Sequence, residues 1–351
     1  MRVLVAGLGA VGQRHARNLR TLLGASLDLH ALRRRRDAAV ITPTLERDDS
    51  RDVERELGCT VHTSLDAALA TRPAAVIVAT PSSHHLGIAT RAAAAGCAIY
   101  VEKPLAHEWY GVNRLLETAR TAGIVGMVGC QWRFHPAVRL VRRALERREL
   151  GRLLHAQVRF GEWLPGWHPY EDHRESYAAR PELGGGVTLT QIHDYDLAHF
   201  LFGDAVAVQA VGGARSSLAL QVDDVMDALC EHRTVDGPLT VHIAQNMAQR
   251  PPERALRVVG EGGWLEADLR EGVIRARRAD GQRIRHDFRP YERNTMFLEA
   301  MGHFLARVGS GTRTDVPLET GAAVLRTALA ARTAASSGER VELADNGVIR
   351  G

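Results

Sequence analysis

Short apolar segments alternate with amphipathic helical segments along the first third of the chain. Apolar runs predict strands at Arg2–Ala6, Leu27–Leu32, Val76–Ala79, Ala98–Val101 and Val125–Cys130. Helical spacing predicts helices at Val11–Leu23, Val53–Leu57, His85–Ala95 and Trp109–Ala122. Because these strands are continuously apolar instead of alternating, we expect both of their faces to be buried. Strands that alternate with helices indicate an α/β fold with a doubly wound parallel sheet.

The pattern changes after a charged helix expected at His135–Arg148. From there, alternating apolar and polar positions predict a large, open and mostly antiparallel sheet. Its expected strands are Leu153–Phe160, Val206–Val211, Val225–Arg233, Leu239–Asn246, Leu256–Val259 and Val273–Arg278. Helices are expected at Val187–Phe202, Thr295–Val308 and Glu319–Ser336. The sequence therefore predicts a parallel-sheet domain at residues 1–128 and an α+β domain at residues 129–351, with a binding site between them.

A glycine-rich motif follows the first predicted strand and opens the first predicted helix. It consists of Gly7, Leu8, Gly9, Ala10, Val11 and Gly12. Glycines at this spacing permit a tight turn and let a pyrophosphate approach the N-terminus of the helix. A purely structural glycine turn is the alternative. The position of the motif in a strand–helix–strand unit favours a Rossmann domain that binds a dinucleotide.

The end of the second predicted strand bears on the choice of dinucleotide. NAD-binding domains usually place Asp or Glu there, about 20 residues after the glycines, to bind the ribose 2′-hydroxyl. This chain has Arg33 and Arg34 instead, and Asp37 comes too late. Guanidinium groups suit a 2′-phosphate. We therefore expect NADP(H) to be preferred, with NAD(H) as the alternative if the arginines form a solvated loop.

A single lysine stands directly after another predicted strand. Of the 45 basic residues only Lys103 is a lysine, so it is a candidate for chemistry that arginine cannot perform. Ligands of parallel sheets bind at the carboxyl ends of the strands, which places Lys103 near the nicotinamide. There its ammonium could polarise a hydroxyl or carbonyl oxygen and exchange a proton. Glu102 is expected to orient Lys103 or the nicotinamide ribose, and the alternative is that the lone lysine is a chance occurrence.

Further polar candidates follow a run of three glycines, Gly184–Gly186. His193 and Asp196 are three residues apart and share one face of the expected helix. His193 is the second candidate for proton transfer, Asp196 could orient His193 or Lys103, and Gln191 is expected to contact the substrate. The alternatives are a core histidine and a metal site of His193, Asp196 and His199. We expect no metal, because hydride transfer between a nicotinamide and an alcohol does not need one.

Together these motifs resemble the GFO/IDH/MocA oxidoreductase family over most of the chain. The most specific element is Glu102-Lys103-Pro104, which follows the strand expected at Ala98–Val101. Thr80 and Pro81 with His85 resemble the nicotinamide-side loop of that family, and Arg133, within Gln131–Pro136, resembles its interdomain crossing. The resemblance implies that these residues bind cofactor, that Arg133 also reaches substrate, and that Lys103 and His193 line the site. It further implies hydride transfer between NAD(P) and sugars, inositols or related polyols.

One departure from the family pattern concerns the residues before His193. Many members carry an aspartate about one helical turn earlier, whereas this chain has Thr188, Leu189 and Thr190. If an aspartate–histidine pair is the usual proton relay, the relay is incomplete here. Lys103 then becomes the better candidate for the proton, with His193 positioning the substrate.

The segment from Trp163 to Tyr177 is dense in aromatic and polar side chains. Its Trp163 and His168 could stack on a sugar ring or bind an anionic group. A loop that forms dimer contacts is an equally weighted alternative. The family resemblance implies homodimers or homotetramers that pack through the C-terminal sheet.

Composition narrows the function classes. Apolar residues make up 45% and charged residues 25%, which is typical of a folded globular protein. The net charge of +4 is spread along the chain, so no nucleic-acid partner is expected. No apolar run is long enough for a membrane span. The four widely spaced cysteines, Cys59, Cys97, Cys130 and Cys230, fit a reducing cytoplasm.

The leading hypothesis is an NADP(H)-dependent oxidoreductase acting on a secondary alcohol or ketone of a sugar, nucleotide sugar or cyclitol. A second hypothesis is an enzyme that uses transient redox for elimination or hydrolysis without net oxidation. A third is a non-catalytic dinucleotide or sugar sensor on the same fold. The missing acid before His193 favours the sensor slightly, and Lys103 argues against it.

Overall fold

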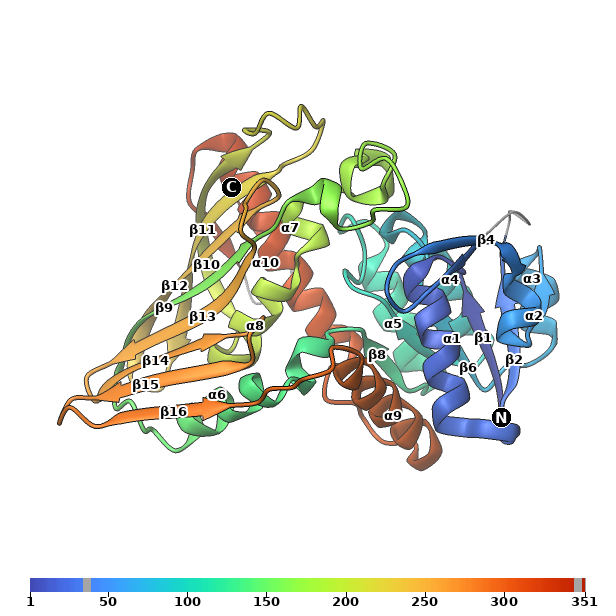
Figure 1. Cartoon of the computed structure of the whole chain (residues 1–351), viewed down its shortest axis with the longest axis horizontal. Helices are drawn as coiled ribbons and strands as arrows, with labels where there is room; N and C mark the ends of the chain where they lie inside the picture. Colours follow the sequence, from blue (N-terminus) through green and yellow to red (C-terminus); the bar gives the residue numbers. More distant parts are fainter. Residues whose placement is uncertain (34–38, 344–348, 351) are drawn as a thin grey trace.

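The N-terminal part of the chain forms a six-stranded parallel sheet with helices on its faces (Figure 1). The computed structural model describes residues 1–33, 39–343 and 349–350. In space the strand order is β5-β2-β1-β6-β7-β8, and every pairing is parallel. The strands are β1 (Arg2–Ala6), β2 (Asp28–Leu32), β5 (Thr60–His62), β6 (Ala75–Val78), β7 (Ala98–Val101) and β8 (Gly126–Val128). The helices are α1 (Ala10–Leu23), α2 (Val53–Leu57), α3 (Leu65–Ala70), α4 (His85–Ala94) and α5 (Val112–Ala122). The doubly wound α/β fold is confirmed, because β6 and β7 are buried at every position.

A two-stranded hairpin that the sequence did not predict lies between β2 and α2. It consists of β3 (Ala39–Ile41) and β4 (Arg47–Asp52). The buried side chain of Gln13 on α1 holds it: Nε2 donates to the carbonyls of Leu8 (3.0 Å) and Ala39 (2.9 Å), and Oε1 accepts from the Ile41 amide (2.8 Å). The hairpin is therefore fixed to the helix that opens at the glycine motif.

The remainder of the chain builds a ten-stranded sheet in the order β16-β15-β14-β13-β9-β12-β11-β10-β17-β18. β9 and β12 pair in parallel and the other neighbours are antiparallel, which confirms the mostly antiparallel sheet. The strands are β9 (Leu153–Gly161), β10 (Ala205–Gly213), β11 (Val225–Thr234), β12 (Gly237–Asn246), β13 (Glu253–Gly260), β14 (Gly263–Asp268), β15 (Val273–Arg278), β16 (Arg283–Asp287), β17 (Val341–Leu343) and β18 (Ile349–Arg350). β14 and β16 were not predicted, because β14 buries only Leu265 and Ala267, and β16 carries one apolar residue, Ile284.

The helix expected at Val187–Phe202 is two helices, α7 (Val187–Thr190) and α8 (His193–Phe202). The chain leaves helical geometry at Gln191, which has φ −109° and ψ 34°. The Asp194 amide donates to Gln191 instead of Thr190 (3.2 Å), so the Thr190 carbonyl is available to another donor. This break shapes the candidate site described below.

The last long helices return to the N-terminal domain. α9 (Asn294–Ser310) lies beside α1, where Asn294 and Asn18 exchange side-chain hydrogen bonds of 2.9 and 3.3 Å (Figure 1). α10 (Leu318–Ser337) runs from the large sheet to β8, and its Leu318 lies against Gly126. The division at residues 128 and 129 stays a prediction, and α9 packs on the first domain although it follows the second in sequence. Among the described residues, no helix is both long and apolar enough to cross a membrane.

Candidate active site

The glycine motif forms a tight turn between β1 and α1. Gly7 has φ +96°, and a Cβ there would lie 2.7 Å from the Ala79 carbonyl oxygen. A Cβ on Gly12 would lie 1.9 Å from the Gly7 carbonyl oxygen, whereas a Cβ on Gly9 would meet nothing within 4 Å. The outer glycines are thus required by the turn, and the middle one faces open space at the N-terminus of a 14-residue helix. That is the geometry a pyrophosphate needs.

The loop after β6 lies against this turn. A Cβ on Gly7 would be 3.1 Å from a side-chain carbon of Thr80, so Thr80 and the following Pro81 stand beside the motif. The buried hydroxyl of Thr80 has no hydrogen-bond partner among the described residues. The ring nitrogens of His85 lie 2.8 Å from the Pro104 carbonyl oxygen and 2.9 Å from that of Thr80. Burial lowers the pKa of His85, and the ring joins two loops of the site. Its contact with the cofactor stays a prediction.

The predicted 2′-phosphate arginines are only partly described. Arg33 follows β2, is 6% exposed, and its Nη1 lies 3.3 Å from Oε1 of Glu54 on α2. Arg34 lies outside the described residues. A carboxylate therefore already stands beside one of the two predicted arginines, which bears on the dinucleotide preference below.

Glu102 and Lys103 lie at the carboxyl end of β7, as expected. His15 Nε2 of α1 is 2.7 Å from Glu102 Oε1, and both side chains are buried. Burial acts to raise the pKa of Glu102, but the hydrogen bond and charge of His15, together with the charges of Lys103 and His85, outweigh it, so the pKa lies below its ordinary value. Lys103 is half-buried, and its Nζ donates to the Thr190 carbonyl at 2.7 Å. The break between α7 and α8 thus provides the acceptor for the catalytic candidate lysine.

His193 begins α8 and faces the same region. It is 5% exposed, its Nε2 lies 3.5 Å from Nε2 of Gln131, and its Nδ1 has no partner among the described residues. Burial, followed by the charges of Lys103, Arg254 and Arg293, holds the pKa of His193 well below its ordinary value. The imidazole is therefore neutral at neutral pH. Together, Lys103 and His193 bring an ammonium and a neutral base to the interface of the two domains.

Two buried ion pairs anchor α8, and neither includes His193. Arg133 Nη2 and Nε donate to Asp196 at 2.6 and 3.0 Å, so Asp196 orients Arg133 and not His193 or Lys103. Arg254 Nη1 donates to Asp194 Oδ1 at 2.8 Å, and its Nη2 donates to Gln191 Oε1 at 2.5 Å. The predicted substrate residues Gln191, Asp196 and Arg133 are thus engaged in protein contacts.

Arg254 was missed by the sequence reasoning. It lies between the rings of Trp132 and Phe160, with its guanidinium carbon 4.9 and 4.5 Å from their centroids. A signal existed, because Arg254 shares its strand face with Leu256 and Val258, which are fully buried. An arginine at an inward position of a strand indicates a paired or functional charge.

The chain that follows the aromatic segment contacts the first domain at Leu183. The Ser82 hydroxyl donates to the Leu183 carbonyl at 3.1 Å. The guanidinium carbon of Arg250 lies 4.0 Å from the centroid of the Trp163 ring. His168 Nδ1 is 2.8 Å from Glu171 Oε1. A role of Trp163 and His168 in substrate binding stays a prediction.

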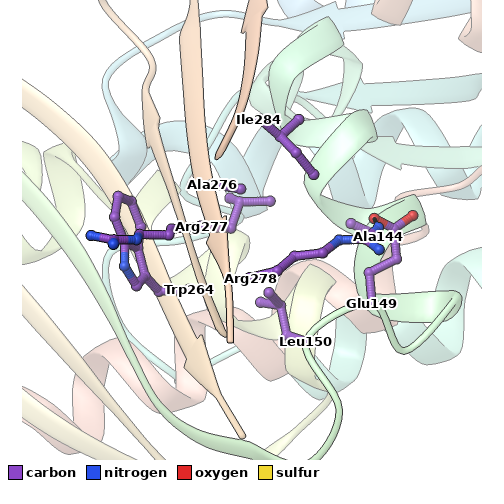
Figure 2. Close-up of a pocket in the computed structure, with 9 residues that line it drawn as sticks. Ala144, Glu149, Leu150, Trp264, Ala276, Arg277, Arg278 and Ile284 are labelled. Atoms are coloured by element: carbon purple, nitrogen blue, oxygen red, sulfur yellow. Dashed lines mark ion pairs between the residues drawn. The ribbon is translucent and has the colours of Figure 1, made fainter. Parts of the chain in front are cut away.

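The described residues support neither a metal site nor a substrate site in the small cavity beside β14 and β15. The described residues contain no cluster of three or more His, Cys, Asp or Glu side chains that could hold a metal. A cavity beside β14 and β15 has a volume of only about 20 Å³, and none of its lining residues was predicted to be functional (Figure 2). Two of its charged lining groups, Arg278 and Glu149, pair with each other at 3.7 Å. A space of this size holds about one water molecule and no substrate.

The parallel sheet, the glycine turn, and a second domain that brings His193 toward Lys103 define a two-domain oxidoreductase fold that binds a dinucleotide. Family comparison agrees on both domains. Residues 1–130 match the model of the oxidoreductase family with an NAD-binding Rossmann fold, and residues 138–266 match the GFO/IDH/MocA C-terminal domain. The chain belongs to the GFO/IDH/MocA family, as the motifs indicated.

Several curated relatives are named as polyol or sugar enzymes. Myo-inositol 2-dehydrogenase of Thermotoga maritima is 27% identical over 352 residues, which cover 98% of each chain. 2,7-Anhydro-N-acetylneuraminate hydratase of Mediterraneibacter gnavus is 26% identical over 69% of this chain, and scyllo-inositol 2-dehydrogenase (NAD(+)) of Bacillus subtilis is 30% identical over 58%. The chain spans only 64% and 54% of the lengths of these last two proteins.

Solved structures share the whole fold. GenD2 from gentamicin A biosynthesis, in complex with NAD, has a TM-score of 0.80 and 25% identity, with 98% of this chain and 96% of that chain covered. Levoglucosan dehydrogenase in complex with NADH has a TM-score of 0.82 at 19% identity, with 98% and 99% covered.

Proposed function

We propose that the protein transfers hydride between a nicotinamide dinucleotide and a secondary alcohol or ketone of a sugar, nucleotide sugar or cyclitol. The position of Lys103 carries this proposal, because its Nζ donates at 2.7 Å to the Thr190 carbonyl, three residues before His193. Relatives named as inositol dehydrogenases and as UDP-N-acetylglucosamine 3-dehydrogenase support the substrate class. The open space at Gly9 and the Thr80 hydroxyl, which has no hydrogen-bond partner in the described part of the chain, fit a dinucleotide that runs from the glycine turn toward Lys103.

In this proposal the bound nicotinamide supplies or accepts the hydride. The Lys103 ammonium holds and polarises the reacting oxygen, and the neutral His193 imidazole accepts the hydroxyl proton during oxidation. The lowered pKa of His193 keeps its imidazole unprotonated and therefore able to accept the proton. This weighting departs from the sequence-based expectation, which favoured Lys103 for the proton.

The proposal also concerns which dinucleotide, NADP(H) or NAD(H), the protein prefers. Arg33 and Arg34 favour NADP(H), as the sequence predicts. The ion pair of Arg33 with Glu54 favours NAD(H) as the second candidate, because Glu54 competes with a 2′-phosphate for the guanidinium.

Substitution of Lys103 tests the function. Lys103→Met is expected to lower turnover by about 10²–10⁴-fold while dinucleotide affinity stays within about threefold. The matched variant Lys103→Arg keeps the charge, and it is expected to remain strongly impaired because a guanidinium does not fit the ammonium position. Turnover is measured from reduced nicotinamide formed with a panel of inositols and sugars. Wild-type turnover in Lys103→Met would remove Lys103 from the mechanism.

A second candidate is transient redox without net oxidation, which two hydratase relatives favour. Such an enzyme regenerates its dinucleotide in each cycle, so it would be purified with tightly retained cofactor. Mass spectrometry of the denatured protein distinguishes the cases, because a simple dehydrogenase is expected to release its dinucleotide.

Assembly through the large sheet completes the proposal. Val211 on β10 and Leu229 on β11 lie on the same face of the sheet and are 68% and 47% exposed, which favours a covered sheet face in a homodimer or homotetramer. Light scattering is expected to show an oligomer that Leu229→Glu weakens. A monomeric wild-type protein would contradict this part.

A further inference from the structure

Gln131 follows the carboxyl end of β8 and opens the crossing between the two domains. It is the first residue of a short 3-10 helix, η3 (Gln131–Phe134), and it is buried. β8 is the parallel neighbour of β7, and Lys103 follows the carboxyl end of β7. Ligands of parallel sheets bind at this edge, so Gln131 and Lys103 stand at the same edge of the candidate site.

A buried ion pair holds η3 against α8. Arg133, two residues after Gln131, donates through Nε and Nη2 to Asp196 at 3.0 and 2.6 Å. Asp196 comes three residues after His193 and therefore lies on the same face of the helix. Gln131 and His193 meet beside this pair: their Nε2 atoms are 3.5 Å apart, and both side chains are buried.

The threonines that precede His193 direct their hydroxyl groups elsewhere. The Thr188 hydroxyl donates to Asp223 at 2.6 Å, and the Thr190 hydroxyl donates to the backbone carbonyl four residues earlier at 2.7 Å. Neither hydroxyl therefore donates to the ring. Among the described residues, Gln131 is the one side chain within hydrogen-bond distance of His193.

The two acids of α8 are also engaged away from the ring. Asp194 is paired with Arg254 at 2.8 Å, and Asp196 is paired with Arg133. The charges that act on the ring are cationic and come from Lys103, Arg254 and Arg293. Within the described part of the chain, His193 thus has a neutral carboxamide beside it and no carboxylate in an ion pair with it.

The orientation of a carboxamide determines which nitrogen of a neighbouring imidazole carries the proton. A neutral imidazole has one N–H donor and one acceptor, and a carboxamide exchanges its donor and acceptor ends when it rotates by half a turn. If the amide nitrogen of Gln131 donates to His193 Nε2, the ring proton lies on Nδ1, which can then only donate. If the amide oxygen accepts from Nε2–H, Nδ1 keeps its lone pair. Both Nδ1 of His193 and Oε1 of Gln131 are buried without a hydrogen-bond partner among the described residues.

We propose that Gln131 is a positioning residue: its side-chain oxygen accepts the Nε2–H of His193 and leaves Nδ1 free to take the substrate proton. This inference rests on the proposed function, in which His193 is the base. During oxidation the substrate hydroxyl gives its proton to Nδ1, and the carbon of the same substrate gives its hydride to the dinucleotide. The imidazolium that forms keeps its Nε2–H on the Gln131 oxygen. A neutral acceptor stabilises this cation less than a carboxylate would, so the ring can release the proton again.

The tautomer of His193 is measured directly by NMR. Protein with ¹⁵N-labelled histidine gives long-range proton–nitrogen correlations that distinguish Nε2–H rings from Nδ1–H rings, and His193→Asn identifies the signals of His193 by their loss. We expect the Nε2–H tautomer in the wild-type protein and a ring that stays neutral down to about pH 6. An Nδ1–H tautomer would overturn the proposal. This measurement needs no substrate, and it holds even where a variant fails to fold.

Gln131→Glu supplies the carboxylate that the ring lacks. A carboxylate at hydrogen-bond distance stabilises the imidazolium, so the titration midpoint of His193 is expected to rise by at least about one pH unit. The matched control is Gln157→Glu, which adds the same charge on β9, where Gln157 Oε1 accepts from Arg159 at 3.2 Å. The control is expected to leave the midpoint unchanged. An unmoved midpoint in Gln131→Glu, or an equal shift in the control, would overturn the proposal.

Gln131→Met removes the acceptor and keeps the approximate volume of the side chain. The substrate is the inositol or sugar of the panel that the wild-type protein oxidises fastest. With it, kcat is expected to fall roughly 10–100-fold while KM and dinucleotide affinity stay within about threefold. Wild-type kcat in this variant would overturn the role of Gln131. Failure of the wild-type protein to bind any dinucleotide would instead overturn the proposed function, whichever tautomer His193 adopts.

Discussion

Replacing Gly9 by alanine separates cofactor binding from folding. Gly9 has φ −69° and ψ −176°, which alanine adopts without strain, and the new Cβ would meet no atom within 4 Å. The folded protein should therefore keep its stability or gain about 0.4–1 kcal/mol from the stiffer unfolded chain. The methyl group would fill the space through which a pyrophosphate approaches the helix amides. Loss of one charge-assisted hydrogen bond costs about 1.5–3 kcal/mol, which is an affinity loss of roughly 10–100-fold.

Gly12→Ala is the matched variant, and it is expected to lower stability where Gly9→Ala lowers dinucleotide affinity. Its Cβ would lie 1.9 Å from the Gly7 carbonyl oxygen, so the turn must shift at a cost of about 1–3 kcal/mol. Thermal unfolding and fluorescence titration with reduced dinucleotide are measured on both variants. We expect Gly9→Ala to lose affinity with an unchanged melting temperature, and Gly12→Ala to lose stability. Wild-type affinity in Gly9→Ala would refute the placement of the pyrophosphate.

The remaining predictions concern buried charges. Asp196→Asn is expected to cost about 3–5 kcal/mol in urea unfolding, because it leaves Arg133 buried at 7% side-chain exposure without its carboxylate. Glu299→Gln, which breaks an exposed pair, should cost less than about 1 kcal/mol, and equal costs would contradict the assignment. Burial lowers the pKa of His232 to about 4. Folding thus favours the neutral ring, so about 3 kcal/mol of stability present above pH ~6.5 is lost as pH falls toward ~4. His232→Gln should flatten the fall in melting temperature over that range, and an unchanged slope would contradict the account.

The sequence predicted those elements whose signal lies within one segment. β7 was predicted at its observed bounds, because Ala98–Val101 is apolar throughout and buried on both faces. The hairpin of β3 and β4 was missed since its partners come from outside: a side chain of α1 supplies its hydrogen bonds. β16 was missed because an exposed edge strand needs little apolar surface.

The residues of the candidate site also differ in whether a local sequence pattern identifies them. The glycine motif and Lys103 are local patterns, and their positions followed from the ends of β1 and β7. The ion-pair partners of Asp196 and Arg254 could not be predicted, because these partners, Arg133 and Asp194, are 63 and 60 residues distant in the chain. The break at Gln191, which frees the Thr190 carbonyl for Lys103, has no helix-breaking residue to announce it.

Fluorescence titration of the purified protein with NADPH and, separately, NADH tests the central claim most directly. The account predicts saturable binding of at least one dinucleotide at the glycine turn. Tighter binding of NADPH, with the difference removed in Arg33→Ala combined with Arg34→Ala, would support the sequence-based preference. Equal or tighter binding of NADH would indicate that Arg33 serves to pair with Glu54 and does not select a 2′-phosphate. Binding of neither dinucleotide would contradict the oxidoreductase account.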